Sequence, residues 1–78
     1  MSAARIYQLS WLDPEYMAAS PDRDLAKATR FQSHPTRAVA IREARKLARK
    51  INGSVYLQAY VRGLYGDEPE GSQEEITK

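Results

Sequence analysis

The sequence predicts a small α+β domain in which one amphipathic helix lies across one face of a small antiparallel sheet, in the order β-β-α-β. Two observations carry this prediction. Apolar residues recur at helical spacing within residues 36–53, and residues 54–66 alternate apolar and polar side chains with the period of a strand. The chain has 78 residues, which is enough for one domain at most. We expect that domain to span residues 1–66, followed by a disordered acidic tail over 67–78.

Residues 4–12 are predicted to form the first strand, because β-branched and aromatic residues are frequent in this segment. The large side chains at alternate positions on one of its faces are Tyr7, Leu9 and Trp11. Ile6 and Leu12 fall on its other face.

Residues 13–24 contain two prolines, each of which biases the preceding residue away from helix. We interpret this stretch as a loop, with one short helical turn near residues 15–19. A second, shorter strand is expected over residues 26–32, and Phe31 is its best candidate for the core.

The helix prediction rests on residues 36–53. Ser33 or Thr36 can cap its start, because a hydroxyl there accepts a hydrogen bond from a free backbone N–H, and Pro35 is tolerated in a first turn. The apolar stripe consists of Ala40, Ile41, Ala44, Leu47, Ala48 and Ile51. Asn52 and Gly53 are expected to end the helix, since glycine adopts the left-handed conformation without penalty.

Residues 54–66 are predicted to form the last strand, next to the first. The side chains expected to pack under the helix are Val55, Leu57, Ala59 and Val61. Those expected on the opposite face are Tyr56, Gln58, Tyr60 and Arg62. With one helix, the sheet would keep one uncovered face.

The net charge of +2 conceals an uneven distribution. Residues 25–62 hold nine Lys and Arg against Glu43, a balance of +8, whereas residues 63–78 hold five acidic residues against Lys78, a balance of −4. A basic body with an acidic tail indicates either a polyanionic partner or a tail that shields the body.

Several classes of protein are disfavoured by composition. The chain has no cysteine, which excludes a disulfide scaffold and a thiolate metal site. The first residues lack the apolar core of a signal peptide, and no apolar run approaches the roughly 18 residues of a membrane span. We expect a soluble protein of the cytoplasm, with no membrane partner.

Catalytic signatures are missing as well. His34 is the only histidine and has no acidic neighbour in sequence, which leaves little from which to build a triad or a histidine-based metal site. Asp13, Glu15, Asp22 and Asp24 lack the spacing of a calcium loop, and no glycine-rich phosphate loop occurs. We expect no enzyme, no catalytic residue, no cofactor and no bound metal.

The basic side of the helix is one candidate binding face. Helical spacing turns five cations away from the apolar stripe, and these candidates for nucleic-acid binding are Arg42, Arg45, Lys46, Arg49 and Lys50. The alternative is a solvated face, because Lys and Arg are good helix formers and are favourable near a helix C-terminus.

The uncovered face of the sheet is the second candidate. Tyr56, Tyr60 and Arg62 alternate on it and are the candidates for protein binding, including formation of a homodimer. Two other interpretations remain open. Aromatic rings beside a cation can stack nucleic-acid bases, and tyrosines on a strand can also be plain surface.

The segment TRFQSHPTRAVAIREARKLARKINGSVYLQAYVRG resembles small bacterial and phage domains of unknown function, which run from a strand through a capped, alanine-rich helix and a glycine into another strand. The same order is similar to that of some small phage anti-CRISPR proteins, which block guide-RNA effector complexes. This resemblance implies a non-enzymatic binding module of phage or mobile-element origin that docks on a protein or ribonucleoprotein partner. The alternative is a direct nucleic-acid binder that uses the basic side of the helix.

Overall fold

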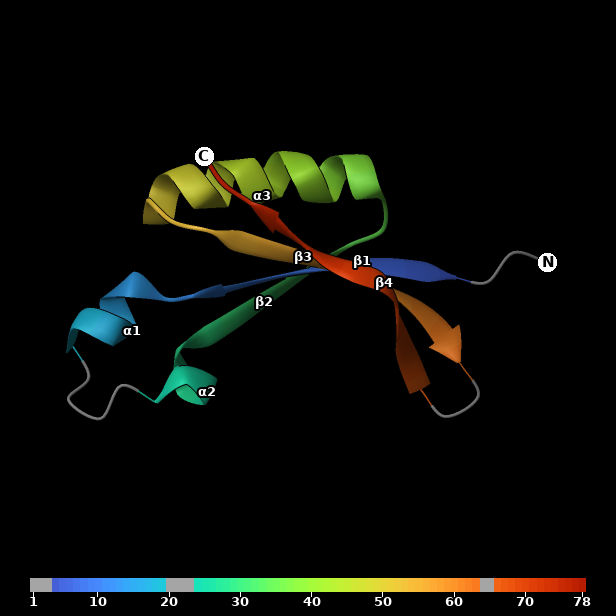
Figure 1. Ribbon diagram of the computed structural model, residues 1–78, viewed down its shortest axis with the longest axis horizontal. Helices are drawn as coiled ribbons and strands as arrows, with labels where there is room; N and C mark the ends of the chain where they lie inside the picture. The colour runs from blue at the N-terminus through green and yellow to red at the C-terminus, as the bar shows by residue number, and fades with distance from the viewer. Residues whose placement is uncertain (1–3, 20–23, 64–65) are drawn as a thin grey trace.

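The computed structural model describes residues 4–19, 24–63 and 66–78. These residues form an antiparallel four-stranded sheet with strand order β2-β1-β3-β4 and a long helix, α3, lying across one face (Figure 1). The elements are β1 (Arg5–Leu12), α1 (Pro14–Ala19), α2 (Leu25–Ala28), β2 (Thr29–His34), α3 (Arg37–Ile51), β3 (Val55–Gly63) and β4 (Gly66–Ile76). The α+β class is confirmed, and the described residues add two short helices and a fourth strand to the predicted order. None of their helices has the length and apolarity needed to cross a membrane.

The central strand β1 organises the sheet. It pairs antiparallel with β2 on one side and with β3 on the other, so β2 and β3 run parallel with β1 between them. α3 connects these two outer partners across one face of the sheet. The predicted contact between the first strand and the strand after the helix is confirmed, and their pairing is antiparallel.

The acidic C-terminal segment belongs to the sheet, in contrast to the disordered tail expected over residues 67–78. β4 pairs with β3 from Gly63 opposite Gly66 to Val55 opposite Ile76, with a register shift between Leu57 and Ala59. The sequence interpretation was wrong here because it was based on the lack of apolar residues in this segment. Backbone pairing with β3 needs no apolar side chain.

Small side chains at the centre of the α3 stripe bring the helix close to the sheet. Its fully buried residues are Ala40, Ala44 and Ala48, and the buried residues of the sheet in this cluster are Leu9, Val55 and Leu57. Larger residues pack around the cluster and are only partly buried: Tyr7, Trp11, Ile41, Leu47, Ile51 and Ile76. The predicted stripe is therefore confirmed, with its alanines at the centre and its larger residues at the flanks.

The caps of α3 follow the predicted chemistry with one correction. Thr36 is the N-cap, and its hydroxyl accepts a hydrogen bond from the Val39 N–H at 3.4 Å. At the other end Asn52, rather than Gly53, takes the left-handed conformation, with φ 53° and ψ 49°. Asparagine tolerates this region because its short polar side chain forms local hydrogen bonds. The Gly53 N–H then donates to the Ala48 carbonyl at 3.1 Å, as in a Schellman motif.

Phe31 lies outside the core, contrary to the sequence prediction. Residues 25–28 form α2, so β2 begins at Thr29, and its register places Phe31 opposite Ser10 and Gln32 opposite the buried Leu9. Phe31 therefore points away from α3 and is 61% exposed. The predicted helical turn near residues 15–19 is present as α1, and residues 20–23 of the predicted loop lie outside the described residues.

Candidate functional site

The side of the sheet away from α3, here called the open face, carries a transverse row of side chains. Residues directly opposite each other in neighbouring antiparallel strands point to the same face. Ser10 of β1 stands opposite both Phe31 of β2 and Tyr56 of β3. Because neighbouring strands lie about 4.8 Å apart, the two aromatic residues flank the small serine at a backbone separation of roughly 10 Å.

Apolar residues are concentrated on the open face. Five large hydrophobic residues are exposed in the described part of the chain, and four of them lie there: Ile6, Leu12, Phe31 and Tyr56. The fifth, Leu25, is on α2. A second row places Ile6 opposite Tyr60, which in turn stands opposite Pro69 of β4. The open face thus carries exposed apolar and aromatic side chains among polar ones such as Gln8, Ser33 and Gln58.

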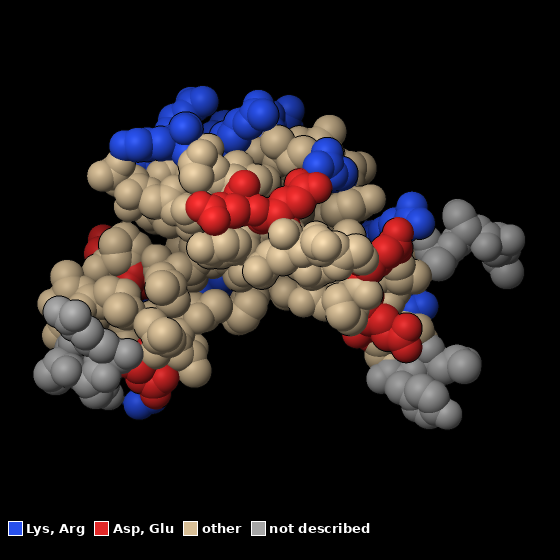
Figure 2. Space-filling view, in the orientation of Figure 1, with Lys and Arg blue, Asp and Glu red and all other residues tan. Residues whose placement is uncertain are grey.

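The open face is hollowed. A cavity of about 290 Å³ on it is lined by Ile6, Gln8, Ser33, Tyr60 and Asp67. Figure 2 shows the molecule arched on the side away from α3, between the end that carries α1 and α2 and the end where β3 meets β4. This shape suits a convex partner better than a flat one.

The sequence candidates Tyr56, Tyr60 and Arg62 all belong to β3 and lie together on the open face. Their alternation along one strand was the signal that grouped them. Sequence reasoning missed Phe31 as a member of this face, because β2 shows no clear alternation and its orientation follows only from its register with β1.

The outer side of α3 carries four cations at i, i+3, i+4 and i+7 spacing, here called the basic stripe: Arg42, Arg45, Lys46 and Arg49. Together with Ala38 and Ile41 they line a shallow hollow of about 290 Å³. In Figure 2 the Lys and Arg atoms along the outer side of α3 form the outermost layer of the molecule. The predicted cluster of cations is therefore contiguous over these four residues.

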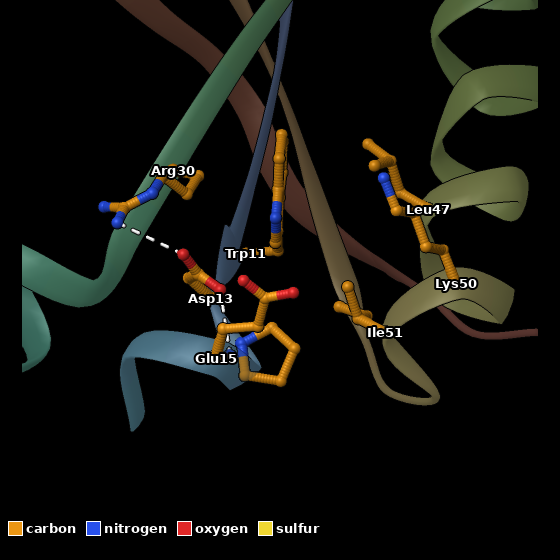
Figure 3. A pocket seen from close by; sticks show the side chains of 8 residues that line it. Trp11, Asp13, Glu15, Arg30, Leu47, Lys50 and Ile51 are labelled. Carbon is orange, nitrogen blue, oxygen red and sulfur yellow. Dashed lines mark hydrogen bonds and ion pairs between the residues drawn. The ribbon is translucent and has the colours of Figure 1, made fainter. Parts of the chain in front are cut away.

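Lys50, the fifth sequence candidate on the helix, faces a different hollow. It lines a pocket of about 310 Å³ at the end of the sheet, together with residues of β1, α1 and the last turn of α3. Figure 3 shows Lys50 beside Leu47 and Ile51 on the helix side of this pocket, with Trp11 across from them. Lys50 also follows Lys46 at i+4 spacing, so it lies next to the end of the basic stripe as well as at this pocket.

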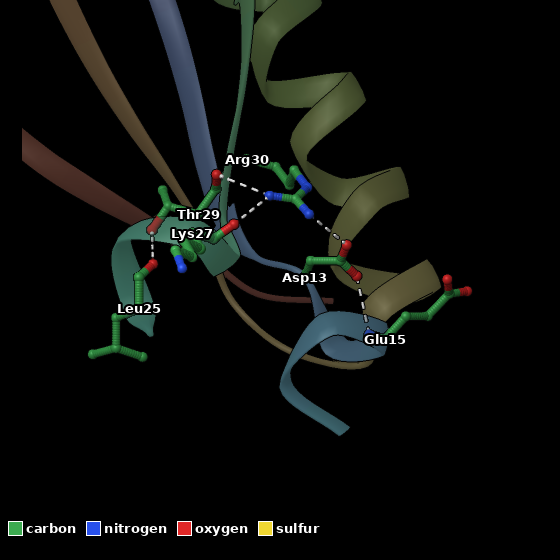
Figure 4. A network of polar contacts seen from close by, with 6 residues as sticks. All are labelled: Asp13, Glu15, Leu25, Lys27, Thr29 and Arg30. Carbon is green, nitrogen blue, oxygen red and sulfur yellow. Dashed lines mark hydrogen bonds and ion pairs between the residues drawn. The ribbon is translucent and has the colours of Figure 1, made fainter. Parts of the chain in front are cut away.

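Arg30, which lines the same pocket as Lys50, has protein partners of its own. Arg30 forms an ion pair with Asp13 at 3.2 Å and donates to the Lys27 carbonyl at 2.6 Å (Figure 4). Its guanidinium also lies 6.0 Å from the centre of the Tyr16 ring. These contacts tie the start of β2 to α1, so this network stabilises the end of the sheet.

The basic stripe has few acidic partners. Among the contacts of the described residues, Lys46 lies 3.6 Å from Glu43, and no ion pair or hydrogen bond reaches the side chains of Arg42, Arg45 or Arg49. Of the acids on β4, Glu74 accepts from Arg37 at 2.8 Å, and Glu74 and Glu75 line one hollow with Arg45. The four cations of the stripe still outnumber Glu43, the one acid within α3.

The polar residues considered for catalysis or metal binding have other contacts. His34 Nε2 lies 3.0 Å from Gln32 Oε1. Asp13 and Asp24 accept from the backbone N–H groups of Glu15 and Ala26, so they cap the first turns of α1 and α2. No group of three or more potential metal ligands occurs within residues 4–19, 24–63 and 66–78, and Asp22 lies outside these ranges.

The comparisons with known proteins add no relative. No protein-family model matches the chain, and no curated protein or solved structure matches it either. Functional inference therefore rests on the chemistry of the open face and of the basic stripe.

Proposed function

We propose that the protein is a non-enzymatic binding module whose open face docks on a partner protein. The observation that carries this proposal is the gathering of Ile6, Leu12, Phe31 and Tyr56 on one side of the sheet, while the other side buries its apolar residues under α3. Covering apolar surface gains about 25 cal/mol per Å², so an exposed cluster of this kind favours association.

The hollowed shape of the open face and its exposed apolar residues favour a convex, apolar element of a foreign protein, such as the apolar side of an amphipathic helix. One of its side chains would enter over Ser10, between the rings of Phe31 and Tyr56. Arg62 and Asp67 stand opposite each other at the end of β3 and β4 and would supply polar contacts at the rim. Two copies of a hollowed face would touch mainly at their rims, which makes a second copy the poorer occupant.

The resemblance to small phage domains implies the same class of partner, a protein or the protein part of a ribonucleoprotein. An anti-CRISPR-like inhibitor would act by covering a working surface of that partner. Such an inhibitor needs a docking face and no catalytic group of its own, which agrees with the proposed role of the open face.

The test uses two charge insertions at similarly exposed sites. Phe31 is 61% exposed on the open face and Leu25 is 57% exposed on α2, so Phe31→Glu and Leu25→Glu should each leave the fold intact. Both variants and the wild type serve as bait in extracts of the source cells. A protein retained by the wild type and by Leu25→Glu, but lost with Phe31→Glu, is then purified and titrated against all three.

We expect the purified partner to bind Phe31→Glu at least tenfold more weakly than Leu25→Glu. The double variant Tyr56→Ala, Tyr60→Ala should lose binding in the same way. Equal retention of the same proteins by both baits would refute docking on the open face. A wild-type dimer in sedimentation velocity that Phe31→Glu converts to a monomer would instead assign the face to a second copy.

A further inference from the structure

The basic stripe has a geometry that solubility alone does not require. Its members recur at i, i+3, i+4 and i+7, so their side chains leave α3 on one side. From Arg42 to Arg49 the helix rises about 10.5 Å at 1.5 Å per residue. A continuous row of four cations therefore covers two turns of a rigid helix.

The charges of the stripe remain available to a ligand. Two acids on β4 pair with cations outside the stripe, Glu70 with Arg5 at 3.1 Å and Glu74 with Arg37 at 2.8 Å. Glu75 accepts from the Ser54 hydroxyl at 2.9 Å and, with Glu74, lines one hollow with Arg45. The described contacts give the guanidiniums of Arg42, Arg45 and Arg49 no protein partner. Arginine guanidiniums with free donors are suited to phosphate, which they can bind through two parallel hydrogen bonds.

The arrangement of acids restricts the direction from which a polyanion can approach. β4 carries Asp67, Glu68, Glu70, Glu74 and Glu75 along an outer strand of the sheet. In Figure 2 the acidic atoms lie below the basic layer that covers α3. A polyanion is repelled along β4 and attracted to the outer side of α3, so its contact is confined to the stripe.

We infer that the basic stripe of α3 binds the phosphate backbone of double-stranded DNA. The stripe has no aromatic side chain, and its hollow is lined by Ala38 and Ile41 besides the cations. Single-stranded nucleic acids are usually bound by stacking bases on aromatic rings, and the exposed aromatic residues Phe31 and Tyr56 lie on the opposite side of the sheet. A duplex instead presents rigid rows of phosphates to a row of cations.

The form of the duplex follows from the shape of α3. A helix on the outer side of a domain enters the wide major groove of B-form DNA, whereas the major groove of an RNA duplex is deep and narrow. α3 contains no Asn or Gln, the residues that pair with adenine. Base contacts, where the arginines make them, would therefore favour guanine, and the remaining contacts would go to the phosphate backbone.

This inference goes beyond the proposed function, because the two surfaces lie on opposite faces of the sheet. The open face and the stripe share no residue. A variant of one surface can therefore be used to test the other, and the two proposals can fail separately.

Fluorescence anisotropy with a labelled 20-base-pair DNA duplex tests the inference. At low salt we expect binding whose affinity falls with a log–log salt slope of about −3, as for three to four phosphates neutralised at about 0.9 each. Arg45→Glu with Arg49→Glu should weaken binding at least tenfold and make the slope shallower by about two. The matched control is Lys27→Glu with Arg62→Glu, which changes the net charge equally, lies off α3 and, among the described contacts, breaks no ion pair.

The result is decisive in either direction. The inference stands if the stripe variant loses binding, the control pair and Phe31→Glu keep it, and thermal melts show that all of them are folded. It fails if the duplex does not bind at about 50 mM salt, or if the control pair loses as much affinity as the stripe pair. Equal or tighter binding of single-stranded DNA, double-stranded RNA or heparin also overturns it, because the site would then have no preference for a DNA duplex.

Discussion

Phe31 on β2 and Tyr56 on β3 stand opposite the same residue of the central strand, Ser10, and so frame a gap that only a small side chain occupies. The gap lies on the open face, where a partner's side chain would enter. The position of this gap is determined by the register of β1 with β2 and with β3, because that register decides which residues stand opposite Ser10. A larger residue at position 10 would fill the gap without touching the core.

We therefore predict that Ser10→Leu keeps the fold and abolishes docking on the open face. Leucine should be tolerated, because position 10 points away from α3 and is only partly buried. A thermal melt within a few degrees of the wild type, together with lost binding in the partner titration, is the expected pair of results. Undiminished binding would show that nothing enters between the two rings.

The centre of the core should be most sensitive at Leu9. This residue is fully buried, so Leu9→Ala should cost about 2–5 kcal/mol of unfolding free energy. Leu47 belongs to the predicted stripe but is only partly buried, so we expect Leu47→Ala to cost less than Leu9→Ala. Urea denaturation of both variants measures the difference. A larger loss for Leu47→Ala would contradict this packing.

Deletion of residues 67–78 should destabilise the protein. The deletion removes the partner of β3, the cover that Ile76 gives the core, and the pairing of Glu74 with Arg37. We expect a clear fall in melting temperature, and Asp67→Asn, at the exposed start of the same segment, serves as the control that should not change it. An unchanged melting temperature after truncation would instead support the prediction of a disordered tail.

The left-handed backbone at Asn52 predicts opposite effects of two small residues. Asn52→Ala should lose about 1–2 kcal/mol, because a Cβ atom without a compensating polar group is strained at φ 53°. Asn52→Gly should be less destabilising or neutral, since glycine adopts this conformation freely, although it loses the contact of the asparagine amide with Lys78. Thermal or urea unfolding should rank glycine above alanine, and the reverse order would show that α3 does not need this conformation.

The sequence was informative wherever a local pattern determined the structure. α3 could be predicted because its period and the cap at Thr36 are contained within one segment, and the alternation of β3 grouped Tyr56 with Tyr60. β4 could not be predicted because its support is non-local. Its acids pair with Arg5 and Arg37, which are 65 and 37 positions away from Glu70 and Glu74.

The candidate surfaces show the same limit. The side of Phe31 follows from pairing between β1 and β2, and no feature of its own segment indicates it. The place of Lys50 at a pocket depends on α1 and β1, which build that pocket beside the last turn of α3. The periodicity of a segment predicts on which face of its helix or strand a side chain lies. The residues that this side chain contacts depend on the neighbouring elements.

The composition of β4 also bears on how the protein behaves when it is concentrated. The edge strand of a sheet has backbone donors and acceptors without partners, which can template the addition of another chain and lead to aggregation. β4 carries Pro69, which lacks a donor, and a series of like charges that repel a second copy. At the opposite edge β2 has only six residues. Both edges thus have a feature that opposes edge-to-edge aggregation, although apolar residues such as Ile6 and Phe31 are exposed on the open face between them.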